Sequence, residues 1–287
     1  MTEGAGRRES VSVYPLPFAL LYSILKSRDL CMREVRVTML KRKILLFGLL
    51  LILCMGVTWA QEATPEPEAT EEAPPPYTHV VVPAADGLPL YGEYYAYWND
   101  APTVLLLHQL YTDRTSWYGI IPALLQSGFN VLNVDLRGHG ETGGLINWRR
   151  ALNDVGVWVE WLHEETGNPQ APVAMIGSSM GSALALLGCA DEPTCPTAIA
   201  ISPGWNYYGL NVERAFTDGL RDKTVLLVYS ERDRWPSLGV PQMLEAATGS
   251  VGTQVYEGNV HGMDLFYTEE DLLPLIVEWL TVYQNIP

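Results

Sequence analysis

Short apolar runs alternate with longer helical patterns from residue 77 to the end of the chain. Seven runs have the length and composition of β-strands: 78–82, 90–97, 103–107, 130–134, 173–176, 198–201 and 225–229. The later runs are apolar on both faces, which is typical of parallel strands buried between two layers of helices. Helical spacing falls between and after them: 116–126, 148–165, 182–187, 241–247 and 269–283. The alternation predicts an α/β domain with a mostly parallel sheet and helices on both faces.

Residues 61–76 separate this pattern from the N-terminal part of the chain. The segment QEATPEPEATEEAPPP has five Glu, five Pro and no aromatic residue. Such a composition cannot bury apolar surface, so we predict a disordered, semi-stiff linker. Residues 77–287 contain no second linker and no internal repeat, which predicts a single domain over that range.

An export signal is predicted within residues 1–60. Residues 39–43 read MLKRK and precede an uncharged apolar run of 17 residues, 44–60, which ends in Ala60. This order is typical of a cleaved signal peptide, and the run is also near the shortest length that spans a bilayer as an anchor. Both alternatives predict a domain outside the cytoplasm, secreted or tethered to the outer face of the membrane, because the positive charges stay inside.

Two further features belong to the same region. Residues 1–38 resemble neither a signal nor a domain, so Met39 is the expected start of the protein. Cys54 lies in the apolar run but follows Leu53, whereas a lipid-attachment cysteine follows a small residue. The pattern therefore does not favour a lipid anchor.

The charge of the chain excludes one class of partner. The formal net charge is −15 although the first 60 residues are basic, so the predicted domain is more acidic than the whole. An acidic surface without a basic stripe is repelled by phosphate backbones, which excludes nucleic-acid binding.

The domain contains two cysteines, Cys189 and Cys195. In an oxidising compartment a pair that closes so short a loop is expected to form a disulfide. No histidine lies nearby to complete a set of metal ligands, so we predict a structural crosslink and no metal.

The strongest chemical signal is the pentapeptide Gly177-Ser178-Ser179-Met180-Gly181, between a predicted strand and a predicted helix. A G-x-S-x-G turn in this context is a nucleophile elbow, whose glycines let the backbone turn sharply and hold the middle serine at the edge of the sheet. The N–H group of Met180 opens the helix and is predicted to stabilise an oxyanion. An ordinary tight turn is the alternative, and the partner residues decide between the two.

Chain order identifies the partners of Ser179, because this arrangement requires serine, acid and histidine in that sequence. Of five histidines, His261 alone follows Ser179, and it lies in a loop before the last predicted helix. The acid is expected just after the last buried strand, where we choose Asp233 to orient His261. Glu231 and, more remotely, Asp264 are alternatives. A solvated surface ion pair is the competing interpretation of these acids.

With these residues the region 77–287 resembles the α/β-hydrolase family, and within it the dienelactone-hydrolase-like esterases. Three more segments match landmarks of that family in order: Leu105–His108, Asp135–Gly140 and Ser202–Gly204. The resemblance implies an α/β-hydrolase fold with a mostly parallel, eight-stranded sheet. It also implies that the Leu110 N–H group joins that of Met180 in the oxyanion hole, and that His108 is structural.

Two departures from the family pattern affect the site. Gln109 stands where the family usually has glycine, and its side chain is expected to narrow the oxyanion loop. About twenty residues, 205–223, follow the sixth strand, too few for a full cap domain, so we predict an open site with minimal or no cap. Candidate substrate contacts are Gln109, Trp205, Tyr207 and Trp235; Tyr208, Trp117 and Tyr118 are further aromatics near the expected rim, and each of these aromatics could equally be core packing.

One motif is set aside. Gly138–Gly143 matches G-x-G-x-x-G, which in dinucleotide-binding domains opens a helix directly within the first β-α-β unit. Here residues 144–146 precede the helix, and two strands and a helical segment come earlier in the alternating pattern. We therefore predict no nucleotide, and the predicted triad implies no other cofactor.

These inferences together predict an exported serine hydrolase, a carboxylesterase for small or medium acyl esters, with polymeric esters also compatible with a location outside the cell. A serine aminopeptidase-like amide hydrolase is the first alternative, although the resemblance implies a cap for that group. A catalytically silent surface binding module is the second, and it predicts a degraded triad. Residues 44–60 remain a candidate membrane anchor.

Overall fold

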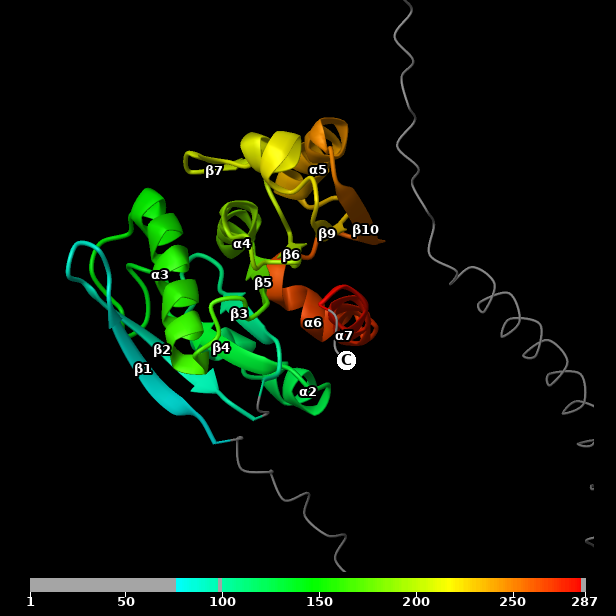
Figure 1. Cartoon of the computed structure of the whole chain (residues 1–287). Helices are drawn as coiled ribbons and strands as arrows, with labels where there is room; N and C mark the ends of the chain where they lie inside the picture. The colour runs from blue at the N-terminus through cyan, green and yellow to red at the C-terminus, as the bar shows by residue number, and fades with distance from the viewer. Residues whose placement is uncertain (1–75, 98–99, 285–287) are drawn as a thin grey trace, which may run out of the picture. The chain divides into compact units, whose positions relative to one another are not determined.

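An eight-stranded sheet organises the chain, in the order β1-β2-β4-β3-β5-β6-β9-β10 (Figure 1). The structure is a computed structural model that describes residues 76–97 and 100–284. The strands are β1 (Thr78–Pro83), β2 (Pro89–Tyr95), β3 (Thr103–Leu107), β4 (Asn130–Val134), β5 (Val173–Ser178), β6 (Thr197–Ile201), β9 (Thr224–Ser230) and β10 (Ser250–Tyr256). β1 pairs with β2 and β2 with β4 in antiparallel fashion, and the strands from β4 to β10 are parallel.

The predicted architecture, an α/β domain with a mostly parallel sheet, is confirmed. The predicted N-terminal extension, the signal or anchor at 44–60 and the linker residues 61–75 lie outside the described residues. The boundaries drawn for these segments stay predictions.

Helices cover both faces of the sheet (Figure 1). They are α2 (Ile121–Gln126), α3 (Trp148–Thr166), α4 (Met180–Asp191), α5 (Arg234–Ala246), α6 (Leu265–Thr268) and α7 (Leu272–Tyr283). Along β3, Leu105 and Leu107 belong to the apolar cluster of α3 and α4, whereas Val104 and Leu106 belong to that of α2 and α7. All four side chains are fully buried, as expected of a strand covered on both faces.

The apolar pattern does not predict β10, because six of its seven residues are exposed or half-buried at the sheet edge. The predicted helix 116–126 is a 3-10 turn (Arg114–Trp117) followed by α2. Of the predicted helix 269–283 only α7 is helical, since α6 ends at Thr268. The predicted helix 241–247 is longer in the structure, where α5 begins at Arg234 and Pro241 lies inside it. Val240 and Met243 of this helix pack into the core.

The segment between β6 and β9 is small, as its length predicts. It contains the two-residue strands β7 (Asn206–Tyr207) and β8 (Leu210–Asn211) and one π-helical turn (Ala215–Gly219). Within the described ranges the fold therefore has no separate cap domain. None of the helices in those same ranges has the length and apolar character needed to traverse a bilayer.

Candidate active site

The nucleophile elbow is the sharp turn from β5 into α4. Ser179 lies at its apex with φ 50° and ψ −114°, a positive φ that a residue other than glycine adopts only under constraint. A Cβ on Gly177 would lie 2.0 Å from the carbonyl oxygen of Gly181, and a Cβ on Gly181 would lie 2.1 Å from that of Leu107. Close backbone contacts therefore require glycine on both sides of the strained serine.

The three predicted catalytic side chains converge at the carboxyl edge of the sheet. His261 Nε2 lies 2.8 Å from Ser179 Oγ, and His261 Nδ1 lies 2.6 Å from Asp233 Oδ2. Because a carboxylate only accepts hydrogen bonds, Nδ1–H donates to Asp233 and Nε2 accepts from the Ser179 hydroxyl. A general base that activates a serine needs this arrangement.

The structure distinguishes Asp233 from the other two candidate acids. The Asp233 side chain is 6% exposed and contacts His261, whereas Glu231 is half exposed and pairs with Arg232 at 2.7 Å. Asp264 is exposed on the short turn after His261. Of the three carboxylates, Asp233 alone is placed to orient the imidazole, and Glu231 forms the solvated surface pair that we weighed as an alternative.

The two predicted oxyanion donors come from segments that touch each other. Met180 is the first residue of α4, where backbone N–H groups have no acceptor within the helix and the helix dipole favours negative charge. Leu110 lies on the turn that leaves β3, and this exit packs against the first turn of α4: a Cβ on Gly181 would lie 2.6 Å from the carbonyl oxygen of His108.

His108 fixes the start of the β3 exit loop. Its Nε2 accepts from the N–H group of Leu136 at 2.9 Å, and its Nδ1 donates to the carbonyl of Gln109 at 2.8 Å. Burial lowers the pKa of His108 to about 4, so the ring is neutral near pH 7 and keeps one donor and one acceptor. These contacts agree with the structural role that the family resemblance implies.

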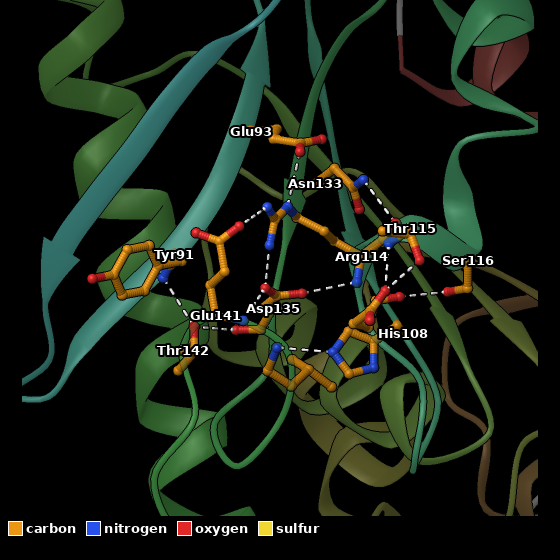
Figure 2. A network of polar contacts seen from close by, with 12 residues as sticks. Tyr91, Glu93, His108, Arg114, Thr115, Ser116, Asn133, Asp135, Glu141 and Thr142 are labelled. Atoms are coloured by element: carbon orange, nitrogen blue, oxygen red, sulfur yellow. Dashed lines mark hydrogen bonds and ion pairs between the residues drawn. The ribbon is translucent and has the colours of Figure 1, made fainter.

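A buried ion-pair network holds the other end of the same loop (Figure 2). Arg114 Nε donates to Glu93 Oε1 at 2.9 Å, and Nη1 of Arg114 pairs with Asp135. The backbone N–H of Arg114 also donates to Asp135 Oδ1 at 2.9 Å. Glu93 and Asp135 are each 1% exposed, and burial of such charges is tolerated only with several partners.

Further donors complete the network. Asp135 accepts from the N–H group of Glu141 at 2.7 Å, and Glu93 accepts from the Tyr118 hydroxyl at 2.8 Å. No motif in the sequence distinguishes the buried Arg114 from the arginines and lysines on the surface. The network is visible only once the fold brings β2, the β3 exit and the loop after β4 together (Figure 2).

Aromatic side chains extend outward from Ser179, beginning with Tyr207. Tyr207 is 3% exposed, and its hydroxyl donates to the carbonyl of Ser202 at 2.9 Å while lying within hydrogen-bonding reach of Ser179. Burial raises the pKa of Tyr207. The ring of Trp235, which is 49% exposed, is centred 5.5 Å from that of Tyr207. Trp205 is half-buried against the core.

The remaining aromatic candidates lie elsewhere. Trp117 is fully buried and packs edge-on against Phe266 with 6.2 Å between ring centroids, so of the two alternatives for this residue core packing holds. The Tyr118 hydroxyl is committed to the ion-pair network. Tyr208 is exposed, with its ring centroid 6.5 Å from that of Trp148.

The Gln109 side chain is directed to the loop that carries His261. Its Oε1 accepts from the N–H group of Met263 and from the Ser178 hydroxyl, each at 3.1 Å. The sequence places Gln109 in the oxyanion loop but contains no signal for these two contacts.

Cys189 and Cys195 form the predicted disulfide, with their Cα atoms 5.2 Å apart. The bond joins the end of α4 to the segment before β6, and Lys223 Nζ donates to the carbonyl of Cys189 beside it. Over residues 76–97 and 100–284, no group of three or more His, Cys, Asp or Glu side chains is placed to hold a metal ion.

A family model described as alpha/beta hydrolase fold matches residues 102–233. Over this range the chain is similar to that family, and it has the α/β-hydrolase fold. The matched region begins just before β3, contains the turn from β5 into α4 and ends at Asp233, before the loop of His261.

The curated proteins that this chain resembles include two uncharacterised proteins from strains of Mycobacterium tuberculosis. Each is 30% identical over 141 residues, which cover 48% of this chain and 49% of the relative. The chain thus spans about half the length of the curated relatives it matches.

Solved structures provide a likeness of fold. An esterase from Pyrococcus furiosus is 22% identical with a TM-score of 0.64, covering 73% of this chain and 92% of that one. A dienelactone hydrolase from Anabaena variabilis is 19% identical with a TM-score of 0.60, covering 74% and 99%. At these identities the fold is shared, and the predicted α/β-hydrolase fold is confirmed.

Proposed function

We propose that this α/β-hydrolase is a serine hydrolase that cleaves carboxylic esters through an acyl-enzyme on Ser179. The observation that carries the proposal is the continuous hydrogen-bonded chain from Ser179 through His261 to Asp233, at an elbow with positive φ. Solved structures of the same fold include an esterase and a dienelactone hydrolase, which makes ester cleavage the first chemistry to test.

In the first half-reaction Ser179 Oγ attacks the ester carbonyl carbon while its proton moves to His261 Nε2. Asp233 accepts the hydrogen bond from Nδ1 and stabilises the imidazolium. The N–H groups of Met180 and Leu110 bind the oxyanion of the tetrahedral intermediate. When this intermediate collapses, the alcohol leaves with the proton from Nε2, and the acyl group remains on Oγ.

In the second half-reaction water hydrolyses the acyl-enzyme. The His261 side chain is 36% exposed, so water can reach the base from solvent. Nε2 takes a proton from the attacking water, and the carboxylic acid leaves as that proton is returned to Ser179 Oγ. Neither half-reaction uses a metal or an organic cofactor.

The small segment between β6 and β9 favours esters over the aminopeptidase-like alternative. Family members of that type bind the substrate amine with acids on a cap, whereas the described residues here form a two-stranded hairpin and one π-helical turn. The same segment supplies Tyr207, which with Trp235 forms an apolar wall beside Ser179. An open site with one aromatic wall suits small or medium acyl groups.

A silent binding module is disfavoured by the completeness of the triad. Nothing in such a module would require a serine with positive φ, a glycine on each side and a buried carboxylate behind the histidine. Strain of this kind is retained where it contributes to function.

We also propose that the domain works outside the cytoplasm, secreted or held by residues 44–60. The Cys189–Cys195 disulfide supports this location, since disulfides persist in oxidising compartments. Intact mass of the protein recovered from cells decides between the two forms. A chain that begins near Gln61 indicates a cleaved signal, whereas a longer chain in the membrane fraction indicates an anchor; recovery of the domain from the cytoplasm would refute export.

A fluorophosphonate probe tests the proposed nucleophile without any choice of substrate. The full chain, purified in detergent, is labelled beside Ser179→Ala and His261→Ala and analysed by intact mass and peptide mapping. We expect one adduct on Ser179 that is absent from both variants. A folded wild-type protein without an adduct would reject the serine-hydrolase proposal and favour the binding module. If the adduct forms, a panel of esters and aminoacyl amides separates the two enzyme alternatives.

A further inference from the structure

The turn that carries His261 is held by side chains from separate strand ends. Ser230, the last residue of β9, donates its hydroxyl to the carbonyl of Val260 at 2.9 Å. Ser202, just after β6, accepts from the N–H group of Gly262 at 2.8 Å and is fully buried. These two contacts fix the backbone on both sides of His261 from the β6 and β9 half of the sheet.

Gln109 holds the same turn from the other side of the nucleophile. It follows β3, and its Oε1 accepts from the N–H group of Met263 and from the hydroxyl of Ser178, the residue before the nucleophile, at 3.1 Å each. The fit is close, because a Cβ on Gly262 would lie 2.0 Å from that same oxygen. One carboxamide oxygen therefore joins the β3 exit, the elbow and the histidine turn.

We propose that Gln109 is a positioning residue that keeps His261 in register with Ser179. The inference rests on the proposed serine-hydrolase function, but it concerns a position where the family pattern has glycine. Glycine has no side chain to accept from Met263 or from Ser178. This chain thus contains a coupling between its oxyanion loop and its catalytic histidine that the family pattern does not provide.

The coupling should act on the chemical step. Without Oε1, the Met263 end of the turn loses its acceptor, and the distance between His261 Nε2 and Ser179 Oγ is no longer fixed from that side. A displacement of about 1 Å at a reacting group can lower the rate on the order of 100-fold. Gln109 Oε1 is occupied by Met263 and Ser178, so substrate affinity should change much less than kcat.

The test compares three variants of the full chain, in each of which a glutamine is replaced by a side chain of about the same length. Gln109→Met removes the acceptor, Gln109→Glu keeps an acceptor at the same reach, and Gln170→Met makes the same change at an exposed glutamine far along the chain. Each variant is measured for kcat and KM with p-nitrophenyl butyrate, for the rate of fluorophosphonate labelling at Ser179, and for thermal unfolding. Amide hydrogen exchange of the peptide that covers residues 260–264 is measured in parallel.

We expect Gln109→Met to lower kcat and the labelling rate roughly 10- to 100-fold with KM within about threefold, while Gln109→Glu recovers most of the loss. Exchange at 260–264 should rise in Gln109→Met and remain at the wild-type rate in Gln109→Glu and Gln170→Met. Wild-type kcat and exchange in Gln109→Met would overturn the proposal. A uniform rise in exchange over the whole chain, with a lower unfolding temperature, would also overturn it, because it indicates a merely structural role.

The failure of the proposed function gives a different result. If the wild-type protein is neither labelled nor active, the serine-hydrolase proposal is rejected by that observation alone. In that case amide hydrogen exchange at 260–264 still tests whether Gln109 fixes the turn. A local rise in exchange in Gln109→Met supports this role, and an unchanged rate refutes it.

Discussion

Two polar clusters lie at the same end of the sheet, and their hydrogen bonding differs. In the cluster around Arg114, two carboxylates with 1% exposure each accept from several donors, and the guanidinium is shared among three carboxylates. In the triad each contact is single: Ser179 to His261, and His261 to Asp233. The first cluster is multiply bonded and largely buried, whereas the second ends in a hydroxyl at a partly exposed turn.

The difference separates a cluster that fixes a loop from a cluster that takes part in the proposed reaction. The buried network around Arg114 joins the β3 exit to β2 and to the loop after β4, so we expect it to fix the loop that carries Leu110. In the proposed mechanism His261 Nε2 accepts the hydrogen bond from Ser179 and then takes its proton. Substitutions in the triad should therefore lower kcat, and substitutions in the Arg114 cluster should lower stability. Three predictions test this comparison, and a fourth concerns His108 at the start of the same loop.

The largest effect is expected from the removal of the nucleophile. Ser179→Ala should lower kcat for p-nitrophenyl butyrate on the order of 10⁶-fold, because no other group can form the acyl-enzyme. Thermal unfolding should be nearly unchanged. Ser237→Ala, at a half-buried serine of α5, is the control, and substantial ester hydrolysis by Ser179→Ala would refute the proposed mechanism.

The acid of the triad should have the next largest effect. Asp233→Asn removes the charge that stabilises the imidazolium and favours the wrong tautomer of His261, so kcat should fall on the order of 10⁴-fold. Glu231→Gln, two residues earlier on the same loop, should retain wild-type kcat. Equal losses in steady-state assays of the two variants would mean that the acid is misassigned.

The Arg114 network should respond in stability rather than in kcat. Arg114→Met leaves Glu93 and Asp135 buried without their cation, which should lower the free energy of unfolding by about 3–5 kcal/mol in urea titrations. Arg214→Met breaks an exposed pair with Asp191 and should cost less than about 1 kcal/mol. The comparison between the clusters fails if Arg114→Met unfolds like its control.

The smallest effect concerns pH. Burial lowers the pKa of His108 from 6.5 to about 4, so the unfolded chain takes up the proton first. The stability from neutral His108 is present at pH 7 and is lost as pH falls from about 6.5 toward 4. Between pH 7 and pH 5 the wild type should lose about 2 kcal/mol more than His108→Gln in urea titrations at both values. Parallel losses would contradict this assignment.

Much of the site could be predicted because its signals are local. The G-x-S-x-G turn needs its glycines within five consecutive residues, and strand–elbow–helix order then leaves His261 as the one histidine available. Asp233 follows a strand whose apolar character on both faces marks it as buried. In the structure His261 lies within hydrogen-bonding distance of both Ser179 and Asp233, and their catalytic roles stay a proposal.

Positions with weak local signals were predicted poorly. β10 lies at the sheet edge and lacks the apolar run of a buried strand, so the pattern misses it. Trp117 could not be placed by composition, since an aromatic residue suits the core and a substrate wall equally. Packing against Phe266 decides that it is core.

The sequence by itself determined the layered architecture and the choice of the three residues proposed as the triad, because apolar periodicity and backbone turns depend on neighbouring residues. Only the tertiary structure decided how the site is held. Arg114 meets Asp135 across 21 residues, and Gln109 meets Met263 across 154. Hydrogen bonds of this kind depend on strand order and register to within a few tenths of an ångström, and no local pattern in the chain encodes that distance.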